Sequence, residues 1–138
     1  MPMIDVYAPA DLFPAGAERG LAERLTAALL RAEGVTEPAA AHLDNTGAYL
    51  HRLPPEAVHT AGTDRARTVR VQVLTPPGVL DREGQRALVA EATRIVGEAS
   101  GDPGQAARTW VLLTEAAEGG WGIAGTAFGR PEFAALKA

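Results

Sequence analysis

Apolar and polar residues alternate in one short part of the chain, and apolar residues recur at helical spacing in two longer parts. Residues 68–73 read Thr-Val-Arg-Val-Gln-Val, and this period of two is typical of a strand with one face on a core. The valines are expected to face helices, with Arg70 and Gln72 on the opposite side. Helical spacing links two sets of apolar residues: Leu21, Leu25, Ala28 and Leu29, and Leu88, Ala92, Ile95 and Val96. The pattern therefore predicts two amphipathic helices packed on a sheet.

Capping and breaking residues mark the ends of these helices. The first follows Pro14 and should stop by about Glu33, because Gly34 is a natural helix terminator. The second should begin after Asp81, a good N-cap residue, and end at Gly101. A short C-terminal helix is expected from about Pro131.

Three further strands are predicted at residues 3–7, 48–53 and 109–114. The order strand, helix, strand then occurs twice, so the predicted fold class is α/β (α+β), a single domain of two tandem β-α-β units. The first unit spans 1–55, a polar linker 56–67, and the second unit, with a C-terminal hairpin and short helix, 68–138. Right-handed crossovers would give a four-stranded sheet with both helices on one face. The other face would be bare, which predicts a closed homo-oligomer.

Composition excludes several classes of function. The chain has 138 residues, enough for one core, and lacks cysteine, so disulfides, thiolate metal sites and cysteine nucleophiles are excluded. Ser100 is the only serine and Lys137 the only lysine, and neither lies in a motif for nucleophilic catalysis. A net charge of -4 without a basic run argues against a nucleic-acid partner. No signal sequence or membrane span is evident, so we expect a cytoplasmic protein with a small-molecule ligand and no membrane partner.

Pro2 is the first candidate for chemistry. An initiator methionine before a small residue such as proline is normally removed, which would leave a secondary amine at the head of the first strand. An α-amino group has a pKa of about 8, and an apolar pocket lowers that pKa because it disfavours the charged form. The free amine would be a general base and its protonated form a general acid. The alternative is that Pro2 only permits removal of Met1.

The sequence near the C-terminus adds to this interpretation. Residues 113–125 read Leu-Thr-Glu-Ala-Ala-Glu-Gly-Gly-Trp-Gly-Ile-Ala-Gly, and the chain begins MPMIDVY. Both segments resemble the 4-oxalocrotonate tautomerases of the tautomerase superfamily, in a tandem-fused form. The resemblance implies a cofactor-independent enzyme in which an amino-terminal proline acts on small 2-oxo acids and related carboxylates. It also implies a trimer or hexamer of β-α-β units, with a trimer expected here.

The resemblance assigns Pro2 as the catalytic amine and Trp121 as the apolar wall that shields it. The two arginines usual in the family fall near Leu12 and Trp110, so neither position carries arginine here.

Substitutes for these arginines must lie elsewhere, because the planar fork of arginine suits a carboxylate. Arg52 and Arg108 are the nearest candidates. Arg52 is the first choice since it lies in a strand with His51 and Tyr49, which are expected to line the substrate site too. The alternative is an ordinary surface arginine.

Other motifs are interpreted as structural. Residues 120–125 match G-x-G-x-x-G, but the chain ends too soon for the helix, strand and acidic residue of a dinucleotide site, so a hairpin is expected. His42, His51 and His59 lack metal-ligand spacing, so no metal is expected. Residues 44–47, Asp-Asn-Thr-Gly, are predicted to form a turn.

The sequence therefore predicts a tautomerase-like isomerase that shifts a proton between enol and keto forms of a small 2-oxo acid, with Pro2 as base. One alternative is a hydratase or dehalogenase on a small unsaturated acid, with Pro2 as acid. The other is a non-catalytic oligomeric binding protein of the same fold.

Overall fold

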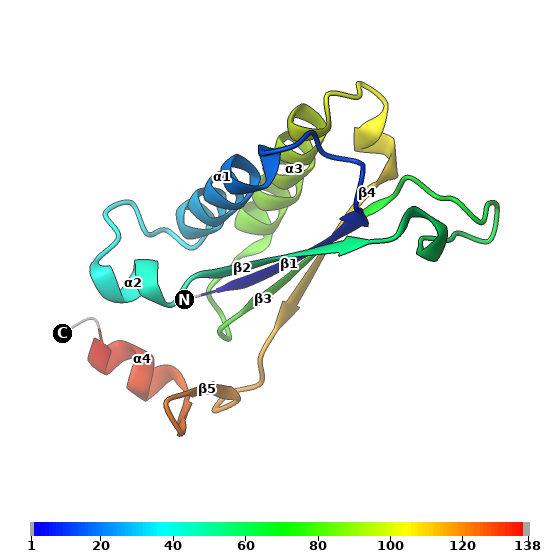
Figure 1. The fold of residues 1–138 in the computed structure, drawn as a ribbon. Coiled ribbons are helices and arrows are strands. Elements are labelled where there is room, and N and C mark those ends of the chain that lie inside the picture. The colour runs from blue at the N-terminus through cyan, green and yellow to red at the C-terminus, as the bar shows by residue number, and fades with distance from the viewer. Residues whose placement is uncertain (1, 137–138) are drawn as a thin grey trace.

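The computed structural model describes residues 2–136, which form a four-stranded sheet with two long helices on one face (Figure 1). A small two-stranded hairpin and a short helix follow at the C-terminal side. The elements in chain order are β1 (Met3–Pro9), α1 (Ala17–Ala32), α2 (Ala40–Asp44), β2 (Gly47–Leu53), η1 (Pro55–Ala57), β3 (Val69–Thr75), α3 (Arg82–Ser100), η2 (Gln105–Arg108), β4 (Thr109–Glu115), β5 (Trp121–Ile123), β6 (Thr126–Phe128) and α4 (Arg130–Leu136).

The sheet has the strand order β2-β1-β3-β4. The outer pairs β1–β2 and β3–β4 are parallel, as expected for strand-helix-strand crossovers, and the central pair β1–β3 is antiparallel. The predicted architecture, with both long helices on one face, is confirmed. The division of the chain into units at residues 55 and 68 stays a prediction.

The register brings four strand ends together. Met3 pairs with Gly47 and with Leu74, and Thr75 pairs with Glu115, so β1 and β2 begin where β3 and β4 end. We call this the Pro2 end of the sheet. The opposite end, where β1 and β2 finish and β3 and β4 begin, is called the far end.

The core lies between the sheet and the two long helices. Ile4 and Val6 of β1 and the valines of β3 are at most 2 % exposed, and they pack against α1 and α3. Both predicted apolar stripes are buried, at residues 21, 25, 28 and 29 of α1 and residues 88, 92, 95 and 96 of α3. The hydrophobic periodicity therefore located the core correctly.

The predicted helix ends are largely confirmed. The carboxylate of Asp81 accepts a hydrogen bond of 2.7 Å from the backbone N–H of Gly84, and Gly101 ends α3 in the left-handed conformation with φ 70°. Gly34 follows α1 with φ 82°. The hairpin β5–β6 is also confirmed, and its two-residue turn, Ala124-Gly125, has positive φ at both positions.

Three local features differ from the prediction. Asp44 is the last residue of the helix α2, not the first residue of a turn, because the preceding alanines favour helix. The polar linker contains η1 and a bridge between Thr60 and Thr63. Helix α4 begins one residue earlier than expected, at Arg130. No helix of residues 2–136 combines the length and apolar character needed to cross a membrane.

Candidate functional site

Pro2 is buried at the start of β1. Its carbonyl accepts a hydrogen bond of 3.1 Å from the N–H of Gly47, which holds it beside β2. Alternation along β1 places Pro2 on the same face as Ile4 and Val6, the face covered by the helices. Continuing the β1–β3 register places it opposite Thr75, which is 1 % exposed. Met1 lies outside the described residues.

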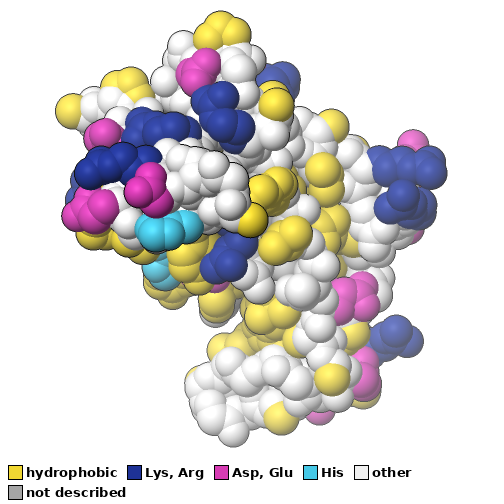
Figure 2. Space-filling model, turned by 90° about the vertical axis from the view of Figure 1, so that its right-hand side faces the viewer, with side chains coloured by type: hydrophobic (Ala, Val, Ile, Leu, Met, Phe, Trp, Pro, Cys, Tyr) yellow, Lys and Arg dark blue, Asp and Glu magenta, His cyan; other side chains and the backbone are white. Residues whose placement is uncertain are grey.

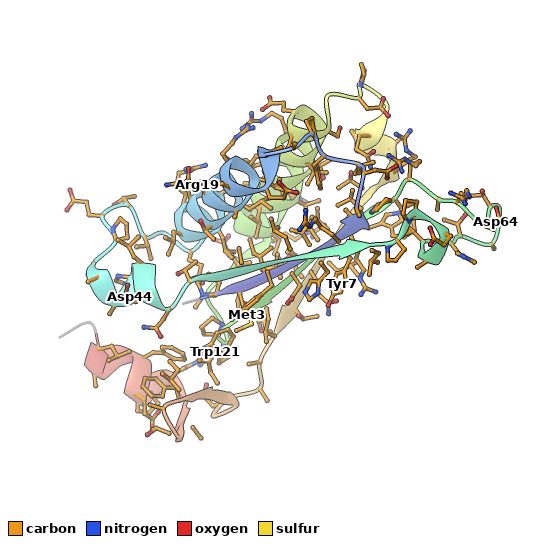
Figure 3. The ribbon with its side chains drawn as sticks, in the orientation of Figure 1. Met3, Tyr7, Arg19, Asp44, Asp64 and Trp121 are labelled. Carbon is orange, nitrogen blue, oxygen red and sulfur yellow. The ribbon has the colours of Figure 1, made fainter. Side chains whose placement is uncertain are left out.

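Three segments outside the sheet meet at this end. Helix α2 leads directly into β2, the turn 76–79 follows β3, and the segment after β4 continues through the hairpin to α4. Trp121 belongs to this last segment and is only 8 % exposed. Figure 3 shows Trp121 below the Met3 end of β1, on the side of the sheet away from the long helices. Trp121 thus lies near the Pro2 end but on the side of the sheet opposite the face to which Pro2 is assigned, and its role as a shield stays a prediction.

A pocket of about 360 Å³ opens at the Pro2 end. It lies between α2, the turn after β3 and α4, and most of its lining is apolar. Its polar side chains come from three elements, and the lining comprises Glu33, Val35, Ala39, Ala41, His42, Pro76, Pro77, Gly78, Val79, Arg130, Phe133, Ala134 and Leu136. Pro2 is not part of the lining. The strands on either side of Pro2 are β2 and β3, and the segments next to them in the chain, α2 and the turn 76–79, do line the pocket.

Arg130 begins α4 and lies over the turn after β3. A Cβ added to Gly78 would be 3.2 Å from Nη2 of Arg130, so the missing side chain leaves room for the guanidinium. Glu118 fixes the arginine from the other side: its Oε1 accepts from the backbone N–H of Arg130 at 2.6 Å, and its Oε2 is 3.6 Å from Nε. The Arg130 side chain remains 76 % exposed, so its charge is accessible.

His42 is held in one tautomer by the helix that carries it. Its Nδ1 accepts a hydrogen bond of 3.1 Å from the N–H of Ala39, which requires the proton of the neutral ring on Nε2. Nε2–H is then a donor in the pocket wall.

Arg52 lies at the far end of the sheet, on the helix face. It pairs with Ala8 in register, so about six residues of β1, or roughly 20 Å, separate it from Pro2. Its guanidinium is 3.3 Å from Glu18 at the start of α1. Within one chain Arg52 does not approach Pro2, and its role in binding a substrate would require a neighbouring copy.

Arg108 also lies at the far end, just before β4. Its guanidinium donates to the carbonyl of Arg67, to Asp102 and to Oε1 of Gln105, whose own side chain is fully buried. The N–H of Gly104 and the guanidinium of Arg108 hold the pKa of Asp102 below its ordinary value. These bonds tie the loop before β4 to the start of β3, so within one chain Arg108 has a structural position.

Tyr49 and His51 lie on the sheet face opposite the helices, which we call the open face. His51 stacks on Tyr7 with ring centroids 4.2 Å apart, and its Nε2 is 2.7 Å from Asp5. Arg70 covers the other side of Tyr7, 4.3 Å from the ring centroid. Alternation in β2 separates Arg52 from Tyr49 and His51, so the three do not form one site within a chain.

The open face also exposes large apolar side chains. Tyr49, Leu74, Trp110 and Leu112 are between 36 % and 54 % exposed. In Figure 2 a band of hydrophobic side chains runs down the middle of the view to the C-terminal part of the chain at the bottom. Among residues 2–136 there is no group of three histidine or acidic side chains placed to hold a metal ion.

The pocket was not predicted from the sequence. Its polar residues are far apart in the sequence: 97 positions separate Glu33 from Arg130, and no motif connects these two with His42. The one available signal was Arg130 directly before Pro131, since proline favours the first turn of a helix and so fixes where the arginine must lie.

No protein-family model and no curated protein matches the sequence. Solved structures do resemble it. A fused 4-OT wild-type symmetric trimer is similar with a TM-score of 0.75 and 21 % identity, over 90 % of this chain and 93 % of that chain. Pt0534 inactivated by 2-oxo-3-pentynoate gives 0.77 and 22 %, over 95 % and 98 %.

The chain has the tautomerase superfamily fold in its tandem-fused form. The predicted resemblance is thereby confirmed at the level of the fold. N1, a member of the cis-3-chloroacrylic acid dehalogenase family, shares this fold with a TM-score of 0.74 and 18 % identity, over 98 % of this chain and 89 % of that chain. Tautomerase-fold neighbours therefore include proteins named for different reactions, and the fold alone leaves the reaction of this chain open.

Proposed function

We propose that this chain is a cofactor-independent tautomerase that shifts a proton between the enol and keto forms of a small 2-oxo acid. Pro2, freed by removal of Met1, accepts and returns the proton. The observation that carries the proposal is the burial of Pro2 at a sheet end that also bears a pocket. An amine in such surroundings loses hydration, which lowers its pKa and leaves part of it as free base at neutral pH.

A hydratase or dehalogenase is the second candidate, and Glu33 favours it. Glu33 follows the C-terminal end of α1, is half-buried and lines the pocket at the Pro2 end. A carboxylate and the negative end of a helix dipole both favour a protonated amine nearby, because they stabilise its positive charge. Pro2 would then be a general acid toward a small unsaturated carboxylate.

Kinetics with two substitutions test the proposal. Intact-mass measurement first establishes that Met1 is lost. Ketonisation of enols of small 2-oxo acids is then followed by ultraviolet absorbance for wild type, Pro2→Ala and the control Pro14→Ala, an exposed loop proline. Loss of a proton-transfer group reduces kcat by roughly 100-fold to 10,000-fold. Equal rates for Pro2→Ala and wild type would refute Pro2 as the base.

The pH dependence separates the two candidates. A general base works when deprotonated, so kcat/KM rises with pH through the pKa of the Pro2 amine. A general acid works when protonated, so kcat/KM falls over the same range. Glu33→Gln should lower this pKa if the carboxylate stabilises the protonated amine, and it should leave the pKa unchanged if the two groups do not interact.

We also propose that the chain forms a closed homo-oligomer through the open face, with a trimer as the expected form. Three exposed apolar side chains on β3 and β4 support this, because a monomer would leave them in water. A neighbouring copy is the only route by which Arg52 or Arg108 reaches Pro2. If Arg108 binds the substrate beside Pro2 of a neighbouring copy, both Pro2→Ala and Arg108→Gln are inactive alone, and mixing the two kinds of chain restores activity. No recovery on mixing would exclude Arg108 from a site shared between copies.

A catalytically silent oligomer of the same fold remains the contrasting function. It predicts a chain that assembles normally and turns over none of the enols tested, whether or not Pro2 is present. The same kinetic series decides this point.

A further inference from the structure

We propose that the pocket between α2, the turn after β3 and α4 binds a small apolar monocarboxylate, and that Arg130 holds its carboxylate. This deepens the proposed function, because it names a carboxylate-binding residue within one chain, where Arg52 and Arg108 are remote from Pro2. Binding itself does not require Pro2 to be catalytic.

The size and lining of the pocket favour a small organic molecule. Its volume of about 360 Å³ is within the range of ligand sites, roughly 300 to 1,000 Å³. Val35, Pro77, Phe133 and Leu136 supply apolar surface from three separate segments. A site of this kind recognises a ligand by covering its apolar body and orienting it with a few polar groups.

Arg130 is the cation of the pocket and is placed to bind an anion. Glu118 contacts its backbone N–H and lies 3.6 Å from Nε, whereas Nη2 faces the turn at Gly78. The edge of the guanidinium that faces away from Glu118 still carries N–H donors. Its planar fork can donate two parallel hydrogen bonds to a carboxylate. Because Gly78 has no side chain, the ligand and guanidinium can approach the backbone there.

His42 and Glu33 determine how the ligand is oriented. Nε2–H of His42 is a neutral donor that can bond a second oxygen of the ligand. Glu33 repels a carboxylate, so the anionic end of the ligand lies by Arg130 and its uncharged end lies toward the α1 side of the pocket.

Titration with phenylacetate tests the proposal directly. This carboxylate has an apolar ring and no enol chemistry, and 2-phenylethanol is its uncharged counterpart. Binding to the full chain is followed by calorimetry or by amide chemical shifts. We expect saturable binding of phenylacetate and at least tenfold weaker binding of 2-phenylethanol, because a charge-assisted hydrogen bond is lost.

Two variants and one control locate the site. Arg130→Gln should weaken phenylacetate binding at least tenfold while leaving 2-phenylethanol binding unchanged. Ala41→Trp, which fills the pocket from an exposed position of α2, should weaken both. Arg86→Gln removes the same charge from α3, away from the pocket, and should bind as wild type. Circular dichroism verifies that each variant is folded.

Several results would overturn the inference. The first is that phenylacetate shows no saturable binding at millimolar concentration. The second is that Arg130→Gln binds phenylacetate as tightly as wild type, and the third is that Arg86→Gln weakens phenylacetate binding as much as Arg130→Gln does. Failure of the proposed function is distinguished by Pro2→Ala. If wild type and Pro2→Ala both bind phenylacetate normally, and wild type shows no turnover or turns over no faster than Pro2→Ala, the pocket stands and the tautomerase proposal falls.

Discussion

Trp110 is expected to contribute more to self-association than to folding. It lies on β4 at the open face and is 49 % exposed, so in the single chain its replacement creates no cavity. Covering the exposed half of a tryptophan removes roughly 100 Å² of apolar surface from water, given the 150 to 250 Å² that aromatic side chains bury. At about 25 cal/mol per Å², each copy would gain roughly 2 to 3 kcal/mol on assembly.

Trp110→Ala should therefore shift association without unfolding the chain. A loss of roughly 2 to 3 kcal/mol per contact corresponds to a dissociation constant roughly 30-fold to 150-fold higher. Sedimentation velocity over a range of protein concentration measures this shift, and thermal unfolding of the dilute chain measures stability. Val89→Ala on α3 is the control, because Val89 is also exposed but lies on the helix side.

If wild type stays monomeric at tens of micromolar, the chain does not associate through the open face, and the reasoning is refuted. If Trp110→Ala assembles like wild type, Trp110 is not part of the contact between copies. An equal effect of Val89→Ala would place the interface on the helices.

Three further predictions concern stability. Asp81→Ala removes the N-cap of α3 and should lower the free energy of unfolding by about 1 kcal/mol in urea titrations. Gly101→Ala forces a side chain to adopt φ 70° and should cost about 1 kcal/mol in the same assay. Hydrogen bonds from Arg24 and Arg94 lower the pKa of Glu98 below its ordinary 4.5. Wild type should therefore be more stable than Glu98→Gln above pH 4.5, and this difference should disappear as the pH falls through the lowered pKa of Glu98. A difference that grows in acid would show that the two arginines do not stabilise the Glu98 carboxylate.

Elements with strong local signals were predictable from the sequence. The alternating valines of β3 and the two apolar stripes define which faces are buried, since only one arrangement hides all of them from water. Asp81 and Gly101 mark helix ends through interactions within a few residues. The hairpin followed from glycine-rich sequence, in which positive φ is available at low cost.

The candidate site was harder to predict because its parts are distant in sequence. Helix α2 has five residues and no apolar stripe, so periodicity cannot reveal it. Adjacency in sequence groups Arg52 with His51 and Tyr49, yet Arg52 points to the opposite face of the sheet from both. Arg130 lies 128 positions after Pro2, and only tertiary folding brings the two to the same end of the sheet.

The antiparallel centre of the sheet explains why residues from both ends of the chain meet in the candidate site. Because β1 and β3 run in opposite directions, the start of the chain meets the end of β3 and β4, and the C-terminal segment continues from there. Leu12 and Trp110, the positions at which the tautomerase resemblance predicts arginine, lie beyond the far end of β1 and near the start of β4 instead. A chain that lacks arginine at both can still bind a carboxylate beside Pro2 if the cation comes from the C-terminal segment. Arg130 is the described arginine that meets this condition, since it lies at the Pro2 end, lines a pocket and keeps its guanidinium exposed.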